Sequence, residues 1–412
     1  MTTPKTLFSL AVILLLFACH NNKTVAQTQP ASADSFVLPE GAVSIVYRGH
    51  IYIPCKIDSI AGNMVFDTGA DRLSIDSTFY ANNAFHKYKT VRVVYSGASS
   101  GKPLRTIAIS DTVSFEFKNY SNRLSRISVH QLKPLFGDFA DGILGKQYFL
   151  NQILEINYLH EYIHFHKDFS TIDSSGYVKI NLKNKGNRLH VPISLQINDG
   201  ISIQDYAMLD IGSNGSINLT TETANSYKLS ENITHKVRYY SKHLTLGGAS
   251  AFYEFRAQSL EIGGFKLDSP TIAYSEDKAG FHSQREDQSV GLLGNDILEH
   301  FDVLIDFVNN DLYLKPNSNF GKPFRFSKLG FGYVDRSITL NAWIVTGFFE
   351  NSNAEAAGLK IDDKIIAVNG IDIHQIPYKE RAAFWDKTDK FTLLVLRNGE
   401  EISIEFETKF VL

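Results

Sequence analysis

Two acidic residues in this chain each follow an apolar run and are followed, two positions later, by a glycine. They lie in Met64-Val65-Phe66-Asp67-Thr68-Gly69-Ala70 and in Ala207-Met208-Leu209-Asp210-Ile211-Gly212-Ser213. A lone carboxylate at the end of a buried strand is costly unless the fold has a use for it. Two carboxyl groups that share one proton supply a general base for water and a general acid for a leaving amine. The pattern therefore predicts hydrolysis by Asp67 and Asp210 acting together, without a metal.

The neighbours of the two acids predict how the pair behaves. Gly69 and Gly212 let the backbone approach the acids and direct N–H groups at them. Ser213 has a hydroxyl that can donate to its acid, whereas Ala70 has none, and a carboxylate with fewer donors is less stabilised in its charged form. We expect the pair to titrate as a unit and to work at mildly acidic to neutral pH. The alternative is that each Asp-x-Gly is an ordinary turn.

The chain repeats its motifs at a nearly constant spacing. Gly142-Ile143-Leu144-Gly145 returns 149 residues later as Gly291-Leu292-Leu293-Gly294, and the two acids are 143 residues apart. A period of this length indicates a duplicated domain, because solenoid repeats span roughly 20 to 50 residues. The Tyr and Phe content is high, at 19 and 29 residues, and apolar residues alternate from Val43 onward, so we expect a mostly β fold.

Small residues mark a hairpin tip in each repeat. Tyr95 to Lys102 is the first and Leu246 to Ser250 is the second. Tyr95, Gly97 and Gly248 are candidates for flaps that close over a substrate. Gly and Ser are equally common at the tips of plain hairpins, so both interpretations remain open.

The N-terminus has the pattern of a targeting segment. Lys5 precedes an apolar run, Leu7 to Ala18, that is too short for a bilayer, which requires roughly 20 residues. Leu16-Phe17-Ala18-Cys19 resembles the lipobox of bacterial lipoproteins, which implies a signal peptide over residues 1–18 and a lipid on Cys19. Residues 19–37 then form a flexible tether, and His20 resembles the residue after the cysteine in lipoproteins sent to the outer membrane. The alternative is an ordinary cleaved signal peptide.

Charge and cysteine content exclude other classes. The formal net charge is −3 and no long basic run occurs, which argues against a nucleic-acid partner. If Cys19 is lipidated, Cys55 is left without an intramolecular disulfide partner.

The two acid motifs resemble those of bilobed aspartic proteases, pepsin-like or tandem retropepsin-like. Asp67-Thr68-Gly69 matches the Asp-Thr-Gly motif fully and Asp210-Ile211-Gly212 in part. The resemblance implies β-barrel-like lobes over residues 38–170 and 187–318, a connection at 171–186, a peptide or protein substrate, and no cofactor. It also implies that the motif threonine bonds across to the other lobe. Thr68 can do so and Ile211 cannot, so a catalytically impaired, peptide-binding envelope lipoprotein is the alternative function.

Residues 324–412 have a different signature. Gly330-Phe331-Gly332-Tyr333, Asn353 to Leu359, and Asp362 to Gly370 occur in an order that looks like a PDZ domain of the bacterial envelope-protease type. That resemblance implies that backbone N–H groups of residues 330–333 receive the carboxylate of a peptide C-terminus, while the next strand pairs with the peptide. Residues 378–387 would form the other wall of the groove. An unrelated small β domain is the alternative.

A literal zinc-protease motif, His160-Glu161-Tyr162-Ile163-His164, also occurs. It binds zinc when a helix places both histidines on one face. The 149-residue spacing aligns this segment with a hairpin turn near Asn310, and on a strand the two histidines would lie about 13 Å apart. We therefore predict no metal at this motif, with His164 and His166 on one face of a hairpin.

Overall fold

The computed structural model describes residues 36–412 apart from 97–102, 119, 187, 246–247, 277, 279–288, 325 and 411. Leu38 to Leu412 form one compact unit. The signal peptide, Cys19 and nearly all of the tether lie outside the described residues. None of the helices in the described ranges has the length and apolar character needed to cross a bilayer.

The first half of the chain forms a sheet that carries Asp67 at the end of a central strand. Its strand order is β6 (Thr90–Ser96), β7 (Pro103–Ile109), β10 (Ile127–His130), β5 (Ser74–Asp76), β11 (Gly142–Gly145), β4 (Ile60–Asp67), β3 (His50–Ile57), β8 (Val113–Phe117) and β9 (Tyr120–Leu124), with β2 (Val46–Arg48) paired to β3. Short helices connect these strands: α1 (Ser77–Asn82), η1 (Ala84–Lys87), α2 (Lys133–Phe136), η2 (Lys146–Tyr148) and η3 (Phe169–Thr171).

The second half repeats this order strand for strand. The sequence across its sheet is β19 (Val237–Thr245), β20 (Gly248–Arg256), β23 (Thr271–Ser275), β18 (Ile217–Leu219), β24 (Gly291–Leu293), β17 (Ile201–Leu209), β16 (Arg188–Asn198), β21 (Ser259–Ile262) and β22 (Phe265–Asp268), with β15 (Lys183–Lys185) paired to β16. Its helices are α3 (Thr221–Ser226), α4 (Leu229–Asn232) and α5 (Asn295–Leu298). The prediction of a mostly β, duplicated fold is confirmed.

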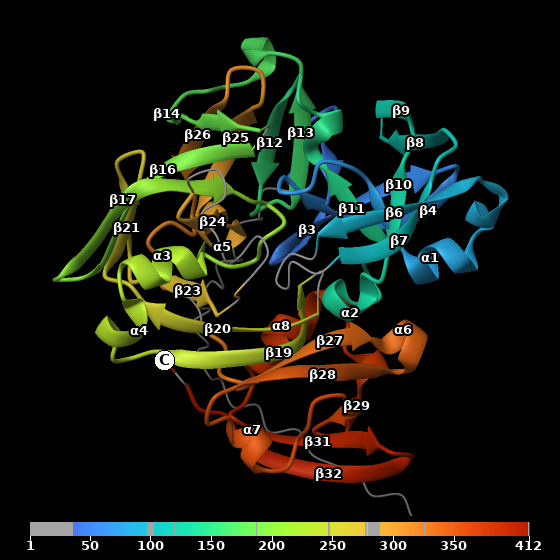
Figure 1. Cartoon of the computed structure of the whole chain (residues 1–412), viewed down its shortest axis with the longest axis vertical. Helices are drawn as coiled ribbons and strands as arrows, with labels where there is room; N and C mark the ends of the chain where they lie inside the picture. Colours follow the sequence, from blue (N-terminus) through green and yellow to red (C-terminus); the bar gives the residue numbers. More distant parts are fainter. Residues whose placement is uncertain are drawn as a thin grey trace, which may run out of the picture. The chain divides into compact units, whose positions relative to one another are not determined.

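A third sheet joins the two halves. Its order is β1 (Val43–Ser44), β13 (Tyr162–His166), β12 (Ile153–Asn157), β25 (Phe301–Asp306), β26 (Asp311–Pro316) and β14 (Val178–Asn181). The equivalent strands β12 and β25 lie side by side and antiparallel (Figure 1). One continuous apolar core, from Ile45 to Phe324, fills both halves, so they fold around shared contacts.

The C-terminal region has its own apolar core, from Leu329 to Phe406. Its elements are β27 (Phe331–Arg336), α6 (Ser337–Leu340), β28 (Ala342–Phe349), α7 (Asn353–Ala356), β29 (Lys364–Val368), β30 (Ile371–Asp372), η5 (Ile373–Gln375), η6 (Tyr378–Glu380), α8 (Arg381–Trp385), β31 (Lys390–Arg397) and β32 (Glu400–Glu407). Asn369 and Gly370 both have positive φ, as a tight hairpin turn of this type requires.

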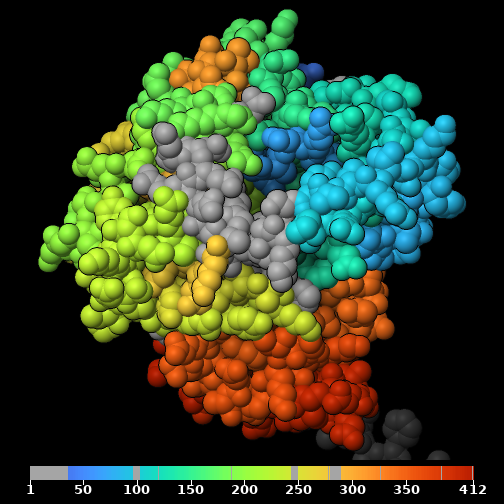
Figure 2. Space-filling view, in the orientation of Figure 1, coloured from blue at the N-terminus to red at the C-terminus, as the bar shows by residue number. Residues whose placement is uncertain are grey.

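Strand pairing continues from the second half into this region. Tyr239, Tyr240 and Ser241 of β19 pair with Phe349, Phe348 and Gly347 of β28. Figure 1 shows these strands next to each other, and in Figure 2 the yellow-green surface of residues near 240 meets the orange surface of the C-terminal region. One arm of the candidate flap hairpin is thus fixed to the C-terminal region.

The first half also contacts the C-terminal region, through the segment after α2. Asp138 accepts hydrogen bonds from Arg336 Nε at 3.0 Å and from Thr339 N at 2.7 Å. The Asp138 N–H donates to the Asp335 carbonyl on β27 at 2.7 Å. Phe139 stacks on Tyr378 with ring centroids 4.6 Å apart. This segment leads directly into β11, next to the strand that bears Asp67.

Two element boundaries lie beside residues that would also favour a turn or a helix cap. The turn before β4 lies at Asp58 and Ser59, which have positive φ, rather than at residues 61–63. The side chain that caps α7 is Ser352, which accepts from Glu355 N, rather than Asn353. In both places several neighbouring residues favour a turn or a cap, and strand pairing decides which one is used.

Candidate active site

The two acids occupy equivalent positions at the ends of paired strands. Asp67 ends β4, where it pairs in parallel with Gly145 of β11. Asp210 follows β17, and its N–H donates to the Leu293 carbonyl of β24 at 2.9 Å. Each acid then accepts a hydrogen bond from the N–H two residues ahead: Gly69 to Asp67 at 2.7 Å and Gly212 to Asp210 at 2.9 Å.

Each glycine of the motif faces the acid of the other half. A Cβ added to Gly212 would lie 2.4 Å from the Asp67 carboxyl carbon, and one added to Gly69 would lie 3.1 Å from Asp210 Oδ1. Any side chain at 212 would push the Asp67 carboxyl away. The two carboxyl groups approach closely enough to share a hydrogen bond. The glycines are therefore needed for the approach of the two loops.

Each of the two buried carboxyl groups affects the pKa of the other. Burial raises the pKa of Asp210 well above its usual range, and the charge of Asp67 raises it further. Burial also raises the pKa of Asp67, but the N–H groups of Ala70 and Gly69 oppose this, as does the hydrogen bond from Asp210. Backbone N–H groups oppose the effect of burial at both acids, from Ala70 and Gly69 at Asp67 and from Gly212 and Gly69 at Asp210, so the two carboxyl groups can share one proton as a unit.

The donor pattern differs from the one predicted. Ala70 does stabilise Asp67, through its backbone N–H at 2.9 Å. The Ser213 hydroxyl instead accepts from Asn218 Nδ2 at 3.0 Å and makes no bond to Asp210. Side-chain composition alone could not show this, because the donors come from the backbone and Asn218 competes for the serine.

Thr68 links the two acid loops from one side. Its hydroxyl donates to the Leu209 carbonyl at 3.0 Å and accepts from the Ile211 N–H at 3.0 Å. Ile211 is fully buried. The Thr68 hydroxyl thus makes two hydrogen bonds to the second acid loop. Ile211, at the equivalent position of that loop, packs in the apolar core instead.

Asn295 supplies a second link that sequence reasoning missed. Its Nδ2 donates to the Ile211 carbonyl at 2.7 Å and to the Gly49 carbonyl of the first half at 2.8 Å. Its Oδ1 accepts from the Tyr158 hydroxyl at 2.8 Å. The equivalent residue 149 positions earlier is Lys146, whose Nζ lies 3.0 Å from Asp71 Oδ1. The repeat spacing could have drawn attention to both residues.

His50 is a second residue that the sequence did not indicate. It begins β3, and its ring bonds to the Gly212 backbone. Burial lowers the pKa of His50 to about 4, so the ring is neutral at physiological pH. Its Nδ1 is buried without a hydrogen-bond partner. The ring contacts Phe136 edge to face, so it packs between the Gly212 loop and α2.

Two hairpins, β6–β7 and β19–β20, carry the predicted flap residues. Tyr95 is exposed and contacts His130 edge to face. Gly97 lies outside the described residues. Gly248 begins β20 and pairs with Thr245. The described parts of the two hairpins differ, because β19 also pairs with β28 and β6 ends its sheet.

A pocket adjoins the second acid loop. It is lined by Asn214, Gly215, Ser216, Asn218, Glu254, Thr271, Ala273, Asp296, Phe326, Ser327 and Phe349. Burial raises the pKa of Glu254 to about 8, and the charge of Asp296 adds to this. The pocket therefore combines acidic groups of the second half with aromatic rings of the C-terminal region.

The predicted peptide-binding residues of the C-terminal region lie at the start of β27. Gly330 has a φ of +74° and its carbonyl accepts from the Phe349 N–H at 3.0 Å. Phe331 is buried, and the Tyr333 hydroxyl accepts from Trp385 Nε1 on α8 at 2.8 Å. A Cβ at Gly332 would lie 2.1 Å from the Tyr239 hydroxyl of β19. These residues therefore also contact the second half.

The metalloprotease motif is not helical. Residues 158–161 form a turn and β13 begins at Tyr162, so His160 and His164 do not share a helix face. The prediction that His164 and His166 lie on one face of a hairpin is confirmed, with ring centroids 3.9 Å apart. Cys55 is buried and free, and burial raises its pKa to about 12.

Comparison with known proteins gives matches among solved structures alone. No protein-family model matches the chain, and no curated protein matches it. Among solved structures, the aspartic proteinase from Irpex lacteus aligns with a TM-score of 0.42 and 12% identity, covering 69% of this chain and 99% of that one. A similarity of this size does not identify a family.

Proposed function

We propose that this protein is an aspartic endopeptidase in which Asp67 and Asp210 activate a water molecule. The observation that carries the proposal is the mutual approach of the two acid loops, in which Gly212 faces the Asp67 carboxyl and Gly69 faces Asp210. Asp67 removes a proton from the water as it attacks the peptide carbonyl. Asp210 supplies the proton that the leaving amine needs. In this division Asp67, which accepts from the Gly69 and Ala70 N–H groups, carries the charge.

Incomplete matching of the second motif does not argue against activity. Ile211 lacks a hydroxyl that could hydrogen-bond back to the first acid loop. One such hydrogen bond contributes about 1 kcal/mol net to stability. Asn295 provides hydrogen bonds between the same loop and the first half. These contacts favour an active enzyme over the alternative, a peptide-binding lipoprotein with a decayed site.

The proposed function is tested with the purified chain and a varied peptide pool. We expect cleavage at mildly acidic to neutral pH that a statine-type inhibitor blocks and that Asp67→Asn and Asp210→Asn abolish. Asp199→Asn, in an exposed turn where the side chain bonds Gln258, is the matched control and retains activity. Cleavage that survives in either active-site variant would contradict the proposed pair. No cleavage at any pH, with peptides still bound, would support the non-catalytic alternative.

The C-terminal region is proposed as a PDZ-like module that binds C-terminal peptides for delivery or regulation. The paired β27 and β28, the Asn369-Gly370 turn and the contact of α8 with Tyr333 support this. Binding by strand addition would require the edge of β27, where Asp335 already accepts from Asp138. Peptides with a free carboxylate should bind more tightly than the same peptides with an amidated end.

Anchoring through a lipid on Cys19, with residence in the bacterial envelope at the outer membrane, completes the proposal. The lipobox-like Leu16-Phe17-Ala18-Cys19 supports it. Membrane fractionation of the wild type and of Cys19→Ser tests this part separately, because the variant should lose membrane association and keep its peptidase activity.

A further inference from the structure

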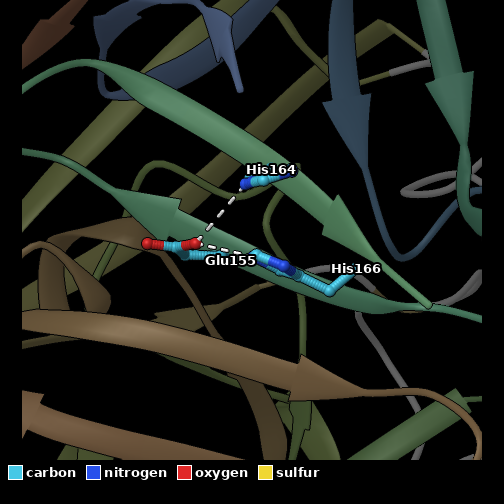
Figure 3. Close-up of side chains that lie close together, drawn as sticks. All are labelled: Glu155, His164 and His166. Carbon is cyan, nitrogen blue, oxygen red and sulfur yellow. Dashed lines mark hydrogen bonds and ion pairs between the residues drawn. The ribbon is translucent and has the colours of Figure 1, made fainter. Parts of the chain in front are cut away.

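Three potential metal ligands meet on one face of the sheet that joins the two halves. Glu155 lies on β12 directly opposite His164 of β13, and His166 lies two residues further along. Side chains two apart on a strand share a face, so both imidazoles project on the side of Glu155. Figure 3 shows both rings next to the same carboxylate oxygen. This cluster shares only His164 with the metalloprotease motif.

The distances between the ligand atoms suit a small divalent cation. His166 Nε2 lies 2.7 Å and His164 Nδ1 lies 4.0 Å from Glu155 Oε2. Ligand atoms around tetrahedral zinc, with bonds of about 2.0–2.2 Å, are about 3.4 Å apart. The two observed distances lie on either side of this value. One ligand atom from each residue lies within 4.8 Å of the others, so small side-chain rotations bring them into range.

Other residues contact the candidate ligand side chains and hold them in place. The Thr171 hydroxyl is 3.2 Å from His166 Nδ1, and the Tyr162 hydroxyl donates to Glu155 Oε1 at 2.7 Å. A Cβ at Gly41 would lie 2.6 Å from His164 Nε2, so the backbone there covers Nε2 while Nδ1 faces Glu155. Partners of this kind orient the ligands of metal sites in proteins.

The ion pair between His166 and Glu155 does not by itself explain why His164 lies beside the same carboxylate. Glu155 is satisfied by His166 and Tyr162, yet His164 is placed against His166 and directed at the same oxygen. An imidazole in this position, with Nδ1 on the side of Glu155, can offer a ring nitrogen to a cation.

We propose that Glu155, His164 and His166 form a binding site for a divalent transition-metal cation, with Zn²⁺ as the ion that these donors fit best. Two imidazoles and one carboxylate leave one coordination position for water. The side chain of His166 is 5% exposed, whereas those of Glu155 and His164 are about 20% exposed, so the ion enters from solvent. The ion ties β12 to β13 and stabilises the sheet between the two halves.

Zinc titration of the metal-stripped full chain tests this proposal without using peptidase activity. We expect one Zn²⁺ per chain by calorimetry, together with a higher melting temperature. His164→Gln and His166→Gln should weaken binding by at least 100-fold, and Thr171→Val by about tenfold, as for partners behind a metal ligand. Co²⁺ bound to the wild type should give strong visible absorption that both histidine variants lose.

His160→Gln is the matched control, because this residue is in the same hairpin and in the metalloprotease motif but not in the cluster. It should bind Zn²⁺ like the wild type. His164→Gln keeps the His166–Glu155 hydrogen bond, so its melting temperature without metal should stay close to the wild-type value and show that it folds. The proposal is overturned if the wild type binds no stoichiometric zinc, if His164→Gln binds as tightly as the wild type, or if His160→Gln is the variant that loses binding.

Discussion

Gly212 lies so close to Asp67 that the residue at this position controls the distance between the two carboxyl groups. Its added Cβ would meet the carboxyl carbon at 2.4 Å, well inside any real contact. The same reasoning applies less strongly to Gly69, where the nearest atoms are 3.0 Å away. At the residue scale, the site therefore depends on the absence of a side chain at Gly69 and Gly212 as much as on the two acids.

We predict that Gly212→Ala reduces peptidase activity by more than about 100-fold while the protein remains folded. The new methyl group displaces Asp67 from Asp210, and misplacing a reacting group by about 1 Å costs this much. Gly200→Ala is the control, because the nearest atom to its added Cβ is Asn198 Oδ1 at 3.6 Å. Kinetics and circular dichroism of both variants check the prediction; equal activity in the two would refute the close approach.

The buried carboxyl group of Glu254 makes the folding stability of the protein depend on pH. Burial raises its pKa to about 8 in the folded protein, against 4.5 when unfolded, so the folded state holds a proton that the unfolded state loses. Its contribution to stability is therefore complete below about pH 4.5 and is lost as the pH rises through 8. Glu254→Gln should remove this loss, which is of the order of 3 kcal/mol between pH 5 and pH 8. Urea unfolding at both values measures it, and an unchanged slope would show that Glu254 titrates normally.

At the scale of elements, the pairing of β19 with β28 is the feature that distinguishes the two candidate flap hairpins. The close approach of these strands depends on Gly347, since an added Cβ would lie 2.1 Å from the Tyr240 carbonyl. Backbone amides in such a pairing exchange with solvent only when the strands separate.

Gly347→Ala should separate β19 from β28 and speed hydrogen exchange in residues 239–241 by about tenfold or more. Exchange in the corresponding strand β6, which has no such partner, should stay the same. Mass spectrometry of both segments measures the effect. Protection that persists in residues 239–241 would mean that the hairpin does not depend on β28.

At the scale of the whole molecule, Asp138 connects the first half to the C-terminal region. Its carboxylate is almost completely buried and is satisfied by Arg336 and Thr339. Removing one partner of such a pair is strongly destabilising, by about 3–5 kcal/mol, because the other charge is left buried. The contact lies in the segment that leads into β11, so it connects the C-terminal region to the strand beside Asp67.

We predict that Asp138→Ala loosens this connection and allows proteases to cleave between residues 318 and 330. The reason is that Arg336 loses its carboxylate partner and Thr339 N–H loses its acceptor. Limited proteolysis compares the variant with Asp335→Asn, which weakens the contact with Arg381 inside the C-terminal region instead. Identical fragment patterns for Asp138→Ala and the wild type would contradict a role of Asp138 in docking.

The sequence determined the broad architecture because its signals are local or repeated. Alternating apolar residues predicted the strands, the 149-residue spacing predicted the duplication, and the position of Asp67 and Asp210 after apolar runs placed both at strand ends. The hairpin at residues 153–166 followed from the same spacing. Each of these features depends on residues close together in the chain or on comparison of the chain with itself.

Only the tertiary structure decided which groups meet. Asn295 of α5 and His50 of β3 reach the acid loops, Ser213 turns to Asn218, and backbone N–H groups of Gly69 and Ala70 donate to Asp67. The cluster of Glu155 with His164 and His166 depends on strand register, and the pairing of β19 with β28 depends on how separate regions dock. Contacts between residues far apart in the chain leave no fixed spacing in one sequence, so the motif at Asp67 indicated a candidate acid, and only the folded chain shows which groups surround it.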